Sequence, residues 1–242
     1  MLGRADNRLL SCCMEEKDLR YDHVEPAVFL ERPNRFIARV RMGSREETVH
    51  VKNTGRCREL LVPGCEVWLS ASDNPARKTR FDLIAVRKAT GVLFNIDSQA
   101  PNRVVAEWLA RQAPDRVIPE YTFGRSRIDF CVERGGVKTL LEVKGCTLEI
   151  GGEGYFPDAP TLRGTKHLRE LTEAVRQGIP AAMAFVIQMD GVTRVQAHRE
   201  TDPAFADALA EAERSGVRVL CLPCHVEPDE LRILDSAPTL MG

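Results

Sequence analysis

A predicted β-hairpin between Ser126 and Lys144 constrains the fold of this chain more than any other stretch. On its first strand, apolar side chains occupy every second position: Ile128, Phe130 and Val132. This period of two is typical of a strand with one buried face. Gly135 and Gly136 follow, and glycine readily adopts the positive φ angles of a tight turn. The returning strand places two apolar residues on one face, and its other face carries Leu140, Glu142 and Lys144.

The hairpin brings two carboxylates together, because Asp129 and Glu142 lie at matching positions of its strands. A divalent cation that binds oxygen takes carboxylates, a carbonyl and water as ligands. Lys144, one pleat away, could orient or deprotonate an attacking water. The spacing Asp129–x12–Glu142–x–Lys144 resembles the PD-(D/E)XK core of metal-dependent nucleases. The same residues also fit a solvent-exposed sheet face, so the pattern leaves both interpretations open.

Charge is unevenly distributed, although the 242 residues carry a formal net charge of only −1. Between Arg32 and Lys88 there are 13 Lys or Arg and 6 Asp or Glu, an excess of +7, so the remainder carries −8. Such asymmetry indicates a polyanionic partner or, alternatively, a solvated arginine-rich surface. The residues that we predict to contact nucleic acid are Arg32, Arg35, Lys52, Arg56, Arg58, Arg77 and Lys78.

The composition, 43% hydrophobic and 29% charged, is that of a soluble globular protein, and no apolar run is long enough to span a membrane. Residues 9–14 are too short for a signal-peptide core, so we expect a cytoplasmic location. The eight cysteines are scattered, and we expect reduced, mostly buried thiols. Cys221-x-x-Cys224-His225 matches a haem-attachment string or half a zinc site, but a buried strand is the favoured interpretation.

Residues 27–97 predict about five short strands with one helical turn at Arg56–Leu61, as in an OB-type barrel. This fold often binds single-stranded nucleic acid. Four aromatic residues could stack on bases but more often fill a barrel core: Phe29, Phe36, Trp68 and Phe81. From Pro101 the predicted order is helix, three strands, helix, strand, helix, strand, which indicates an α/β domain. We expect these helices to be capped by Asn102, Thr165 and Asp202.

A loop rich in glycine and proline follows the hairpin, and its polar groups are dense: Asp158, Thr161, Arg163, Lys166 and His167. Cationic side chains beside backbone amides at a helix N-terminus would suit a phosphate. The alternative is a structured connector in which Arg163 pairs with Asp158.

Several strings together resemble the sugar fermentation stimulation protein (SfsA) family of bacteria and archaea. They include Val49-His-Val-Lys-Asn-Thr-Gly-Arg56, Ser126-Arg-Ile-Asp-Phe130, Glu142-Val-Lys144 and Tyr155-Phe-Pro-Asp-Ala-Pro-Thr161. The resemblance runs from about residue 25 to the C-terminus, and it implies an N-terminal OB-fold, a C-terminal nuclease-like α/β domain and DNA binding. It also implies metal ligation by Asp129 and Glu142, a role for Lys144, and Glu120 as an accessory acid. Pro119 stands where we would expect a basic residue before that acid.

We therefore expect a loosely ordered extension (1–24), an OB-fold domain (25–99) and a nuclease-like α/β domain with a mixed sheet (100–242). The leading hypothesis is a Mg²⁺- or Mn²⁺-dependent nuclease that holds metal with Asp129, Glu142 and the Val143 carbonyl, and that binds DNA largely independently of sequence. The alternative is a non-catalytic DNA-binding regulator of sugar metabolism, and a third is an enzyme for a phosphorylated sugar or nucleotide. Without metal the two carboxylates should repel, which predicts that Glu142→Gln is tolerated. Oligomeric state stays open.

Overall fold

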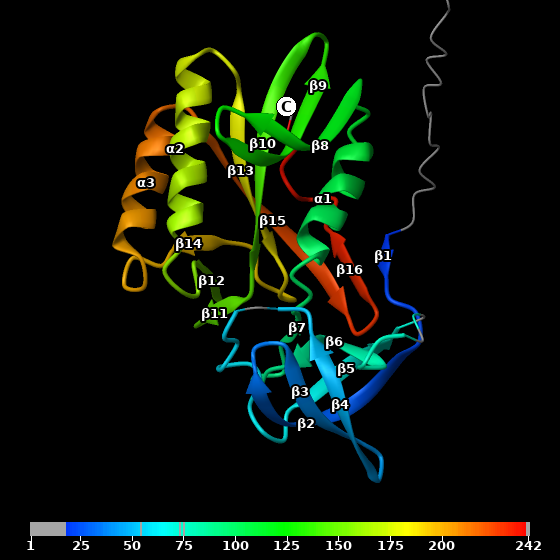
Figure 1. Cartoon of the computed structure of the whole chain (residues 1–242). Helices are drawn as coiled ribbons and strands as arrows, with labels where there is room; N and C mark the ends of the chain where they lie inside the picture. The colour runs from blue at the N-terminus through cyan, green and yellow to red at the C-terminus, as the bar shows by residue number, and fades with distance from the viewer. Residues whose placement is uncertain (1–17, 54, 73, 75, 241–242) are drawn as a thin grey trace, which may run out of the picture.

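The computed structural model describes residues 18–53, 55–72, 74 and 76–240, and it folds them into two domains stacked along one axis (Figure 1). The barrel of the first domain lies at one end, and the sheet and helices of the second lie at the other. No helix in these ranges is long and apolar enough to cross a membrane.

The first domain is the predicted OB-type barrel. Its strands are β2 (Val24–Asn34), β3 (Ile37–Met42), β4 (Arg45–Val51), β5 (Glu66–Ala71), β6 (Phe81–Arg87) and β7 (Leu93–Asn95). Their order is β4-β3-β2-β5-β6-β7, and a parallel pairing of β4 with β6 closes five of them into a barrel. Three of the four aromatic residues are buried: Phe29 and Phe81 lie in the barrel core, and Trp68 lies in the hydrophobic cluster that also contains residues of the second domain. Only Phe36, 47% exposed, is left as a candidate for stacking.

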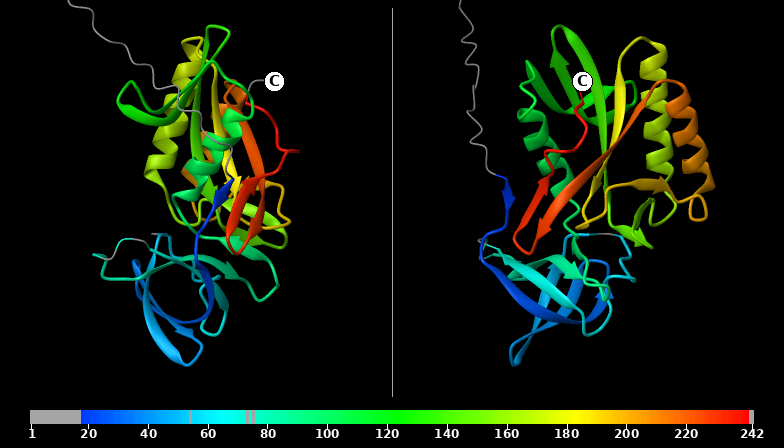
Figure 2. Two further views of the ribbon diagram at one scale, coloured as in Figure 1. Left: turned by 90° about the vertical axis from the view of Figure 1, so that its right-hand side faces the viewer. Right: turned by 180° about the vertical axis from the view of Figure 1, so that it is seen from behind.

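The second domain is the predicted α/β unit, built on a seven-stranded mixed sheet of order β1-β16-β15-β13-β10-β9-β8. Its strands are β1 (Leu19–Arg20), β8 (Arg116–Phe123), β9 (Ser126–Arg134), β10 (Val137–Cys146), β13 (Ala181–Ile187), β15 (Arg218–Glu227) and β16 (Glu230–Ile233). A small second sheet contains β11 (Leu148–Ile150), β12 (Glu153–Phe156) and β14 (Val195–Ala197). Helix α1 (Ala100–Ala110) packs on one face of the main sheet, and α2 (Leu162–Arg176) and α3 (Pro203–Arg214) pack on the other (Figures 1 and 2).

The hairpin that the sequence predicts is formed by β9 and β10. Gly135 and Gly136, with φ of 57° and 78°, make its turn, and the antiparallel register runs from Arg134 opposite Val137 to Phe130 opposite Leu141. The strict alternation expected on β9 is interrupted, because Ile128 packs under α2 whereas Phe130 packs with α1. The ladder therefore ends just before the carboxylate pair, where the strands diverge.

The expected loose extension is wrong for its last residues. Leu19 and Arg20 form β1 and pair with β16, and Leu19 is 1% exposed (Figure 2). The Tyr21 hydroxyl lies 3.3 Å from Asp97 Oδ2, to which it donates a hydrogen bond. The chain therefore contributes a strand to the second domain before it builds the barrel, because burial of Leu19 against α1 and β16 stabilises this short strand. Residues 1–17 lie outside the described ranges.

Two of the three predicted helix caps are wrong. The N-cap of α1 is Gln99, without a side-chain bond, and Asn102 lies inside the first turn. The N-cap of α2 is Thr161, whose hydroxyl accepts from the Gly164 amide at 3.0 Å, so Thr165 lies within the helix. Pro101 and the Pro160–Thr161 turn place these helix starts earlier than the apolar periodicity indicated. Asp202 caps α3 as predicted, accepting from the Phe205 amide.

The described cysteines are six free thiols, and Cys12 and Cys13 lie outside the described ranges. Cys224 is buried in β15, where burial raises the pKa of its thiol to about 12. Among the described residues no group of three or more His, Cys, Asp or Glu could hold a metal. The string 221–225 therefore forms part of a strand, as the favoured interpretation held.

Candidate active site

Asp129 and Glu142 lie side by side at the point where the β9–β10 ladder stops. Asp129 Oδ2 accepts a hydrogen bond of 2.8 Å from the Val143 amide, and Oδ1 accepts one of 3.1 Å from Asn102 Nδ2. The Asp129 side chain thus replaces the backbone partner that a continued ladder would supply. Its orientation is fixed by one neighbouring strand and one helix.

The carboxylate of Glu142 is almost fully buried, at 1% exposure. Its Oε1 accepts from Lys144 Nζ at 2.5 Å and from Nδ1 of His167, a residue 25 positions later on α2. Its Oε2 is also buried and has no hydrogen-bond partner among the described residues. Burial raises the pKa of Glu142, but the His167 bond and the Lys144 charge outweigh it, so the pKa lies below the ordinary value. Glu142 is held as a carboxylate with one oxygen unsatisfied.

For Asp129 the balance is reversed, and its pKa lies above the ordinary value. Burial and the negative charge of Glu142 raise the pKa of Asp129, and the Val143 and Asn102 hydrogen bonds and the Lys144 charge offset them only in part. A cation between two carboxylates would remove this repulsion. The raised pKa of Asp129 and the unpaired Oε2 of Glu142 are the features expected of residues that fit a divalent metal.

These groups open into a cavity of about 400 Å³, which we call the carboxylate hollow. It is lined by Ser98, Gln99, Asn102, Asp129, Glu142, Val143, Lys144 and Arg163. In an extended strand the amide and carbonyl of one residue face the same neighbour, so the Val143 carbonyl lies on the side of its Asp129-bonded amide. Two carboxylates and a carbonyl can thus converge here. With only two protein carboxylates, a bound Mg²⁺ would keep several waters.

The loop residues predicted to bind phosphate have different placements. Arg163 and Lys166 are exposed on the first turns of α2, and Arg163 reaches the carboxylate hollow. Lys166 Nζ lies 3.7 Å from Glu170 Oε1. His167 is buried and bonded to Glu142, and Thr161 is the helix cap, so each has a structural partner. Phosphate contact by these two residues stays a prediction. The structure shows no Arg163–Asp158 ion pair between these two described residues, which removes the alternative for this loop.

Glu120, the proposed accessory acid, lies on β8 opposite Asp129 in the strand register, between the Pro119–Phe130 and Tyr121–Ile128 pairs. Its carboxylate is exposed and forms an ion pair of 2.6 Å with Arg127. It does not line the carboxylate hollow. Its backbone is left-handed, with φ of 53°, and the accessory role stays a prediction.

The seven basic residues predicted to contact nucleic acid divide into two groups. Arg32 donates to four backbone carbonyls, those of Arg35, Asn53, Gly55 and Arg56, at 2.6–2.9 Å. Lys52 lies 3.3 Å from Asp97 Oδ2, and Arg77 binds both oxygens of Asp82. These bonds hold the barrel together, and nucleic-acid contact by the three residues stays a prediction. The remaining four are exposed, without carboxylate partners in the described part of the chain: Arg35, Arg56, Arg58 and Lys78.

Three of these exposed or partly exposed arginines surround a second cavity, of about 270 Å³, which we call the arginine hollow. Its lining is Arg32, Asn34, Arg35, Gly55, Arg56, Arg58 and Leu61. The exposed ring of Phe36 lies beside it, 5.1 Å from the Arg35 guanidinium carbon. A planar aromatic next to guanidinium groups is a surface that suits stacked bases and their phosphates.

Sequence analysis missed two residues of the site. Asn102 was interpreted as a helix cap, but its amide holds Asp129. His167 was recognised as polar but not as the partner of Glu142. The available signal was their position: Asn102 directly follows Pro101 at one predicted helix start, and His167 lies two residues after Thr165, the predicted start of the next helix.

Fold and site together define a two-domain protein: an OB barrel joined to an α/β domain with a carboxylate pair and a lysine on its central hairpin. The chain belongs to the sugar fermentation stimulation protein family. The family model described as "SfsA N-terminal OB domain" matches residues 30–96, and that described as "Sugar fermentation stimulation protein RE domain" matches residues 99–230.

Curated relatives extend this assignment over most of the chain. A sugar fermentation stimulation protein homolog of Desulfitobacterium hafniense (strain Y51) is 48% identical over 90% of this chain and 96% of its own length. One of Clostridium beijerinckii is 43% identical over 92% of this chain and all of its own. The structure titled "The structure of Pyrococcus Furiosus SfsA in complex with Ca2+" superposes with a TM-score of 0.81 at 28% identity, covering 91% of this chain and 97% of that one.

Proposed function

We propose that this protein hydrolyses phosphodiester bonds in nucleic acid with the help of a Mg²⁺ or Mn²⁺ ion held between Asp129 and Glu142. The observation that carries the proposal is the buried, unpaired Oε2 of Glu142 beside a second carboxylate. A buried carboxylate oxygen without a partner costs free energy, and a cation ligand would remove that cost.

The metal ligands would be Asp129, Glu142 and the carbonyl of Val143. A bound divalent ion would neutralise charge on the phosphate and lower the pKa of a coordinated water. The residues are consistent with an oxygen-binding ion rather than zinc. The described lining of the carboxylate hollow contains no cysteine, and His167 uses its Nδ1 to hold Glu142. The Ca²⁺ in the Pyrococcus furiosus relative supports a divalent ion in this family.

The chain's own residues have separable tasks in this proposal. His167 fixes the Glu142 carboxylate from behind, as a residue bonded to a metal ligand commonly does. Lys144, whose ammonium lies at the mouth of the hollow, orients or deprotonates the attacking water. Arg163 contacts the phosphate from α2, where the helix N-terminus adds favourable potential.

A cleavage assay with single-stranded, duplex and branched DNA, with and without Mn²⁺, tests the proposal. Glu142→Gln should abolish Mn²⁺-dependent cleavage, and Lys144→Ala should slow it by about 10²–10⁴-fold while sparing Mn²⁺ binding. Glu133→Gln on the same hairpin is the matched control, since Glu133 pairs only with Lys138 at 3.6 Å. Equal cleavage by all four proteins would reveal a contaminating nuclease and refute the assignment.

A non-catalytic DNA-binding regulator of sugar metabolism is the second candidate function. Lys144 favours it, because its ammonium already compensates Glu142 at 2.5 Å and allows the site to persist without a metal. The exposed arginines of the barrel would supply binding by charge alone. Sequence-independent DNA binding without cleavage and without Mn²⁺ affinity in the parent protein would select this function.

A further inference from the structure

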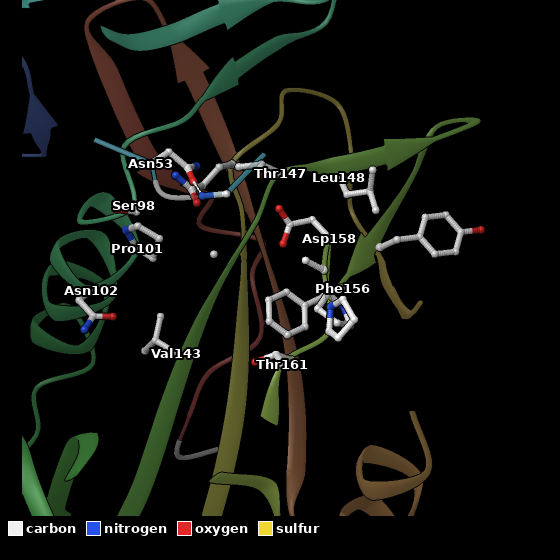
Figure 3. Close-up of a pocket in the computed structure, with 17 residues that line it drawn as sticks. Asn53, Ser98, Pro101, Asn102, Val143, Thr147, Leu148, Phe156, Asp158 and Thr161 are labelled. Atoms are coloured by element: carbon white, nitrogen blue, oxygen red, sulfur yellow. Dashed lines mark hydrogen bonds between the residues drawn. The ribbon is translucent and has the colours of Figure 1, made fainter. Parts of the chain in front are cut away.

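A third cavity, of about 390 Å³, lies between the two domains directly beside the carboxylate hollow (Figure 3). Asn102 of α1 stands on one side of this interdomain pocket, and Phe156 and Asp158 stand on the other. Asn53 of the barrel closes one end, and Val143 of β10 contributes to the floor. Both domains are therefore needed to form it, and its volume falls in the range of about 300–1,000 Å³ common for ligand sites.

The interdomain pocket adjoins both cavities already described. It shares Ser98, Asn102 and Val143 with the carboxylate hollow, and it shares Gly55 with the arginine hollow. A Cβ on Gly55 would lie 2.9 Å from Asp158 Oδ2, so the two domains approach closely at this shared residue. The three cavities form one track from the barrel surface to the carboxylate pair.

Charge along this track alternates. The arginine hollow has four guanidinium groups. The carboxylate hollow has Lys144 and Arg163 beside its two carboxylates, whereas the described lining of the interdomain pocket includes no Lys, Arg or His. Its one charged lining residue within the described chain is Asp158, which has no hydrogen-bond or ion-pair partner there. A phosphate would be repelled from this pocket and attracted to the arginine hollow. It would also be attracted to the carboxylate hollow once a divalent ion offsets Asp129 and Glu142.

We propose that the interdomain pocket receives one unpaired nucleobase of a single-stranded nucleic acid, next to the phosphate that occupies the carboxylate hollow. The proposal rests on the proposed function for its nucleic-acid substrate and adds the strand form and the base contact. A polynucleotide alternates anionic phosphates with neutral bases, which matches the alternation of the three cavities. A paired base would first have to leave its duplex, so single strands are the favoured substrate.

Two side chains give the pocket its chemistry. The Phe156 ring offers an apolar face, and contacts with Phe205 and Phe185 at centroid distances of 5.1 and 5.4 Å hold it in place. The Asp158 carboxylate only accepts hydrogen bonds, so it selects a base edge that donates from an amino or imino group. Stacking plus an acceptor fits a base better than a free sugar, which has no π-face to stack.

The test is equilibrium binding of a fluorescein-labelled single-stranded 12-mer to the full-length protein, measured by anisotropy with Ca²⁺ in place of Mn²⁺. The length of the oligonucleotide is checked on a gel after each titration, so that any cleavage is detected. In a series of oligonucleotides, one base at a time is replaced by an abasic spacer. We expect one position at which the spacer weakens binding by about tenfold, as loss of one stacked base does. Neighbouring positions should show a smaller effect.

Two variants assign that position to the pocket. Thr147→Phe would fill the interdomain pocket, and Thr193→Phe at an exposed position is its matched control. Asp158→Asn would remove the charged acceptor, and Asp190→Asn at an exposed position is its control. Thr147→Phe should reduce the tenfold difference to less than about twofold, and Asp158→Asn should reduce it in part, while both controls keep it. Asp158→Asn is a small change, so it answers the question even if Thr147→Phe fails to fold.

Equal affinity for every abasic oligonucleotide, or an unchanged tenfold difference in both pocket variants, would overturn the base pocket. The Mn²⁺ cleavage assay decides separately on the proposed function. A parent that shows the abasic effect but never cleaves keeps the base pocket and loses the nuclease. A parent that cleaves but is indifferent to abasic positions keeps the nuclease and loses the pocket.

Discussion

Neutralising the two site carboxylates should have opposite consequences for the metal-free protein. In Glu142→Gln the amide oxygen can still accept from Lys144 and His167, but it lacks the negative charge that strengthens both hydrogen bonds. A hydrogen bond to a charged group contributes about 1.5–3 kcal/mol, so the variant should lose about 2–3 kcal/mol of unfolding free energy. For a chain of this length that corresponds to a fall in Tm of about 4–12 °C.

Asp129→Asn should cost almost nothing in the same conditions. The substitution removes the repulsion from Glu142 that raises the pKa of Asp129, and the amide oxygen can still accept from Val143. Loss of the favourable Lys144 attraction partly offsets this gain. The expected change in unfolding free energy is within about 1 kcal/mol of zero, and a small increase is the favoured sign.

Thermal unfolding at pH 7 in EDTA, followed by the same measurement with Mn²⁺, checks both values. Glu133→Gln is the control and should change the unfolding free energy by less than about 1 kcal/mol, as expected for an exposed ion pair. Mn²⁺ should raise the Tm of the parent and of this control but not of the two site variants. Equal destabilisation of the metal-free protein by Asp129→Asn and Glu142→Gln would show that the charged partners of Glu142 do not make it the more stabilising carboxylate.

Three further predictions concern the barrel. Replacing Arg56, Arg58 and Lys78 with glutamate should abolish most nucleic-acid binding without lowering Tm. For the parent protein, log Kd should change with log salt concentration by about 0.7–0.9 per neutralised phosphate. A salt titration in which the affinity stays constant would contradict this prediction. Arg32→Ala should lower the unfolding free energy by about 2–3 kcal/mol in urea denaturation, because four backbone carbonyls lose a charged donor. Burial raises the pKa of Asp82, but Arg77 and His50 outweigh it, so the pKa lies below its ordinary 3.8. Its stabilisation is present above that value and lost as the pH falls below it, so the unfolding free energy of the parent should decline more steeply there than that of Asp82→Asn.

The structure reverses one expectation from sequence. Repulsion between the two facing carboxylates predicted that Glu142→Gln would be tolerated. In the structure this repulsion raises the pKa of Asp129, so Asp129→Asn is the substitution that we expect to be tolerated. The two residues look equivalent in the sequence, since both are acids on alternating strands. They differ because His167 reaches Glu142 from α2, whereas Asp129 receives only an amide from Val143 and one from Asn102. No local pattern indicates which of two acids a histidine 25 residues away will contact.

Local sequence determined the hairpin, the barrel strands and the position of the carboxylates, because strand period and glycine turns depend on neighbouring residues alone. From the strand pairing it followed that Asp129 and Glu142 would meet. The tertiary structure alone decided how each charged group is used: Arg32 and Arg77 hold the barrel, and Arg56 remains exposed. It also formed the interdomain pocket from Asn53 and Asp158, which are 105 positions apart. Such choices depend on which distant segments pack together, and burial of apolar surface across the whole chain sets that packing.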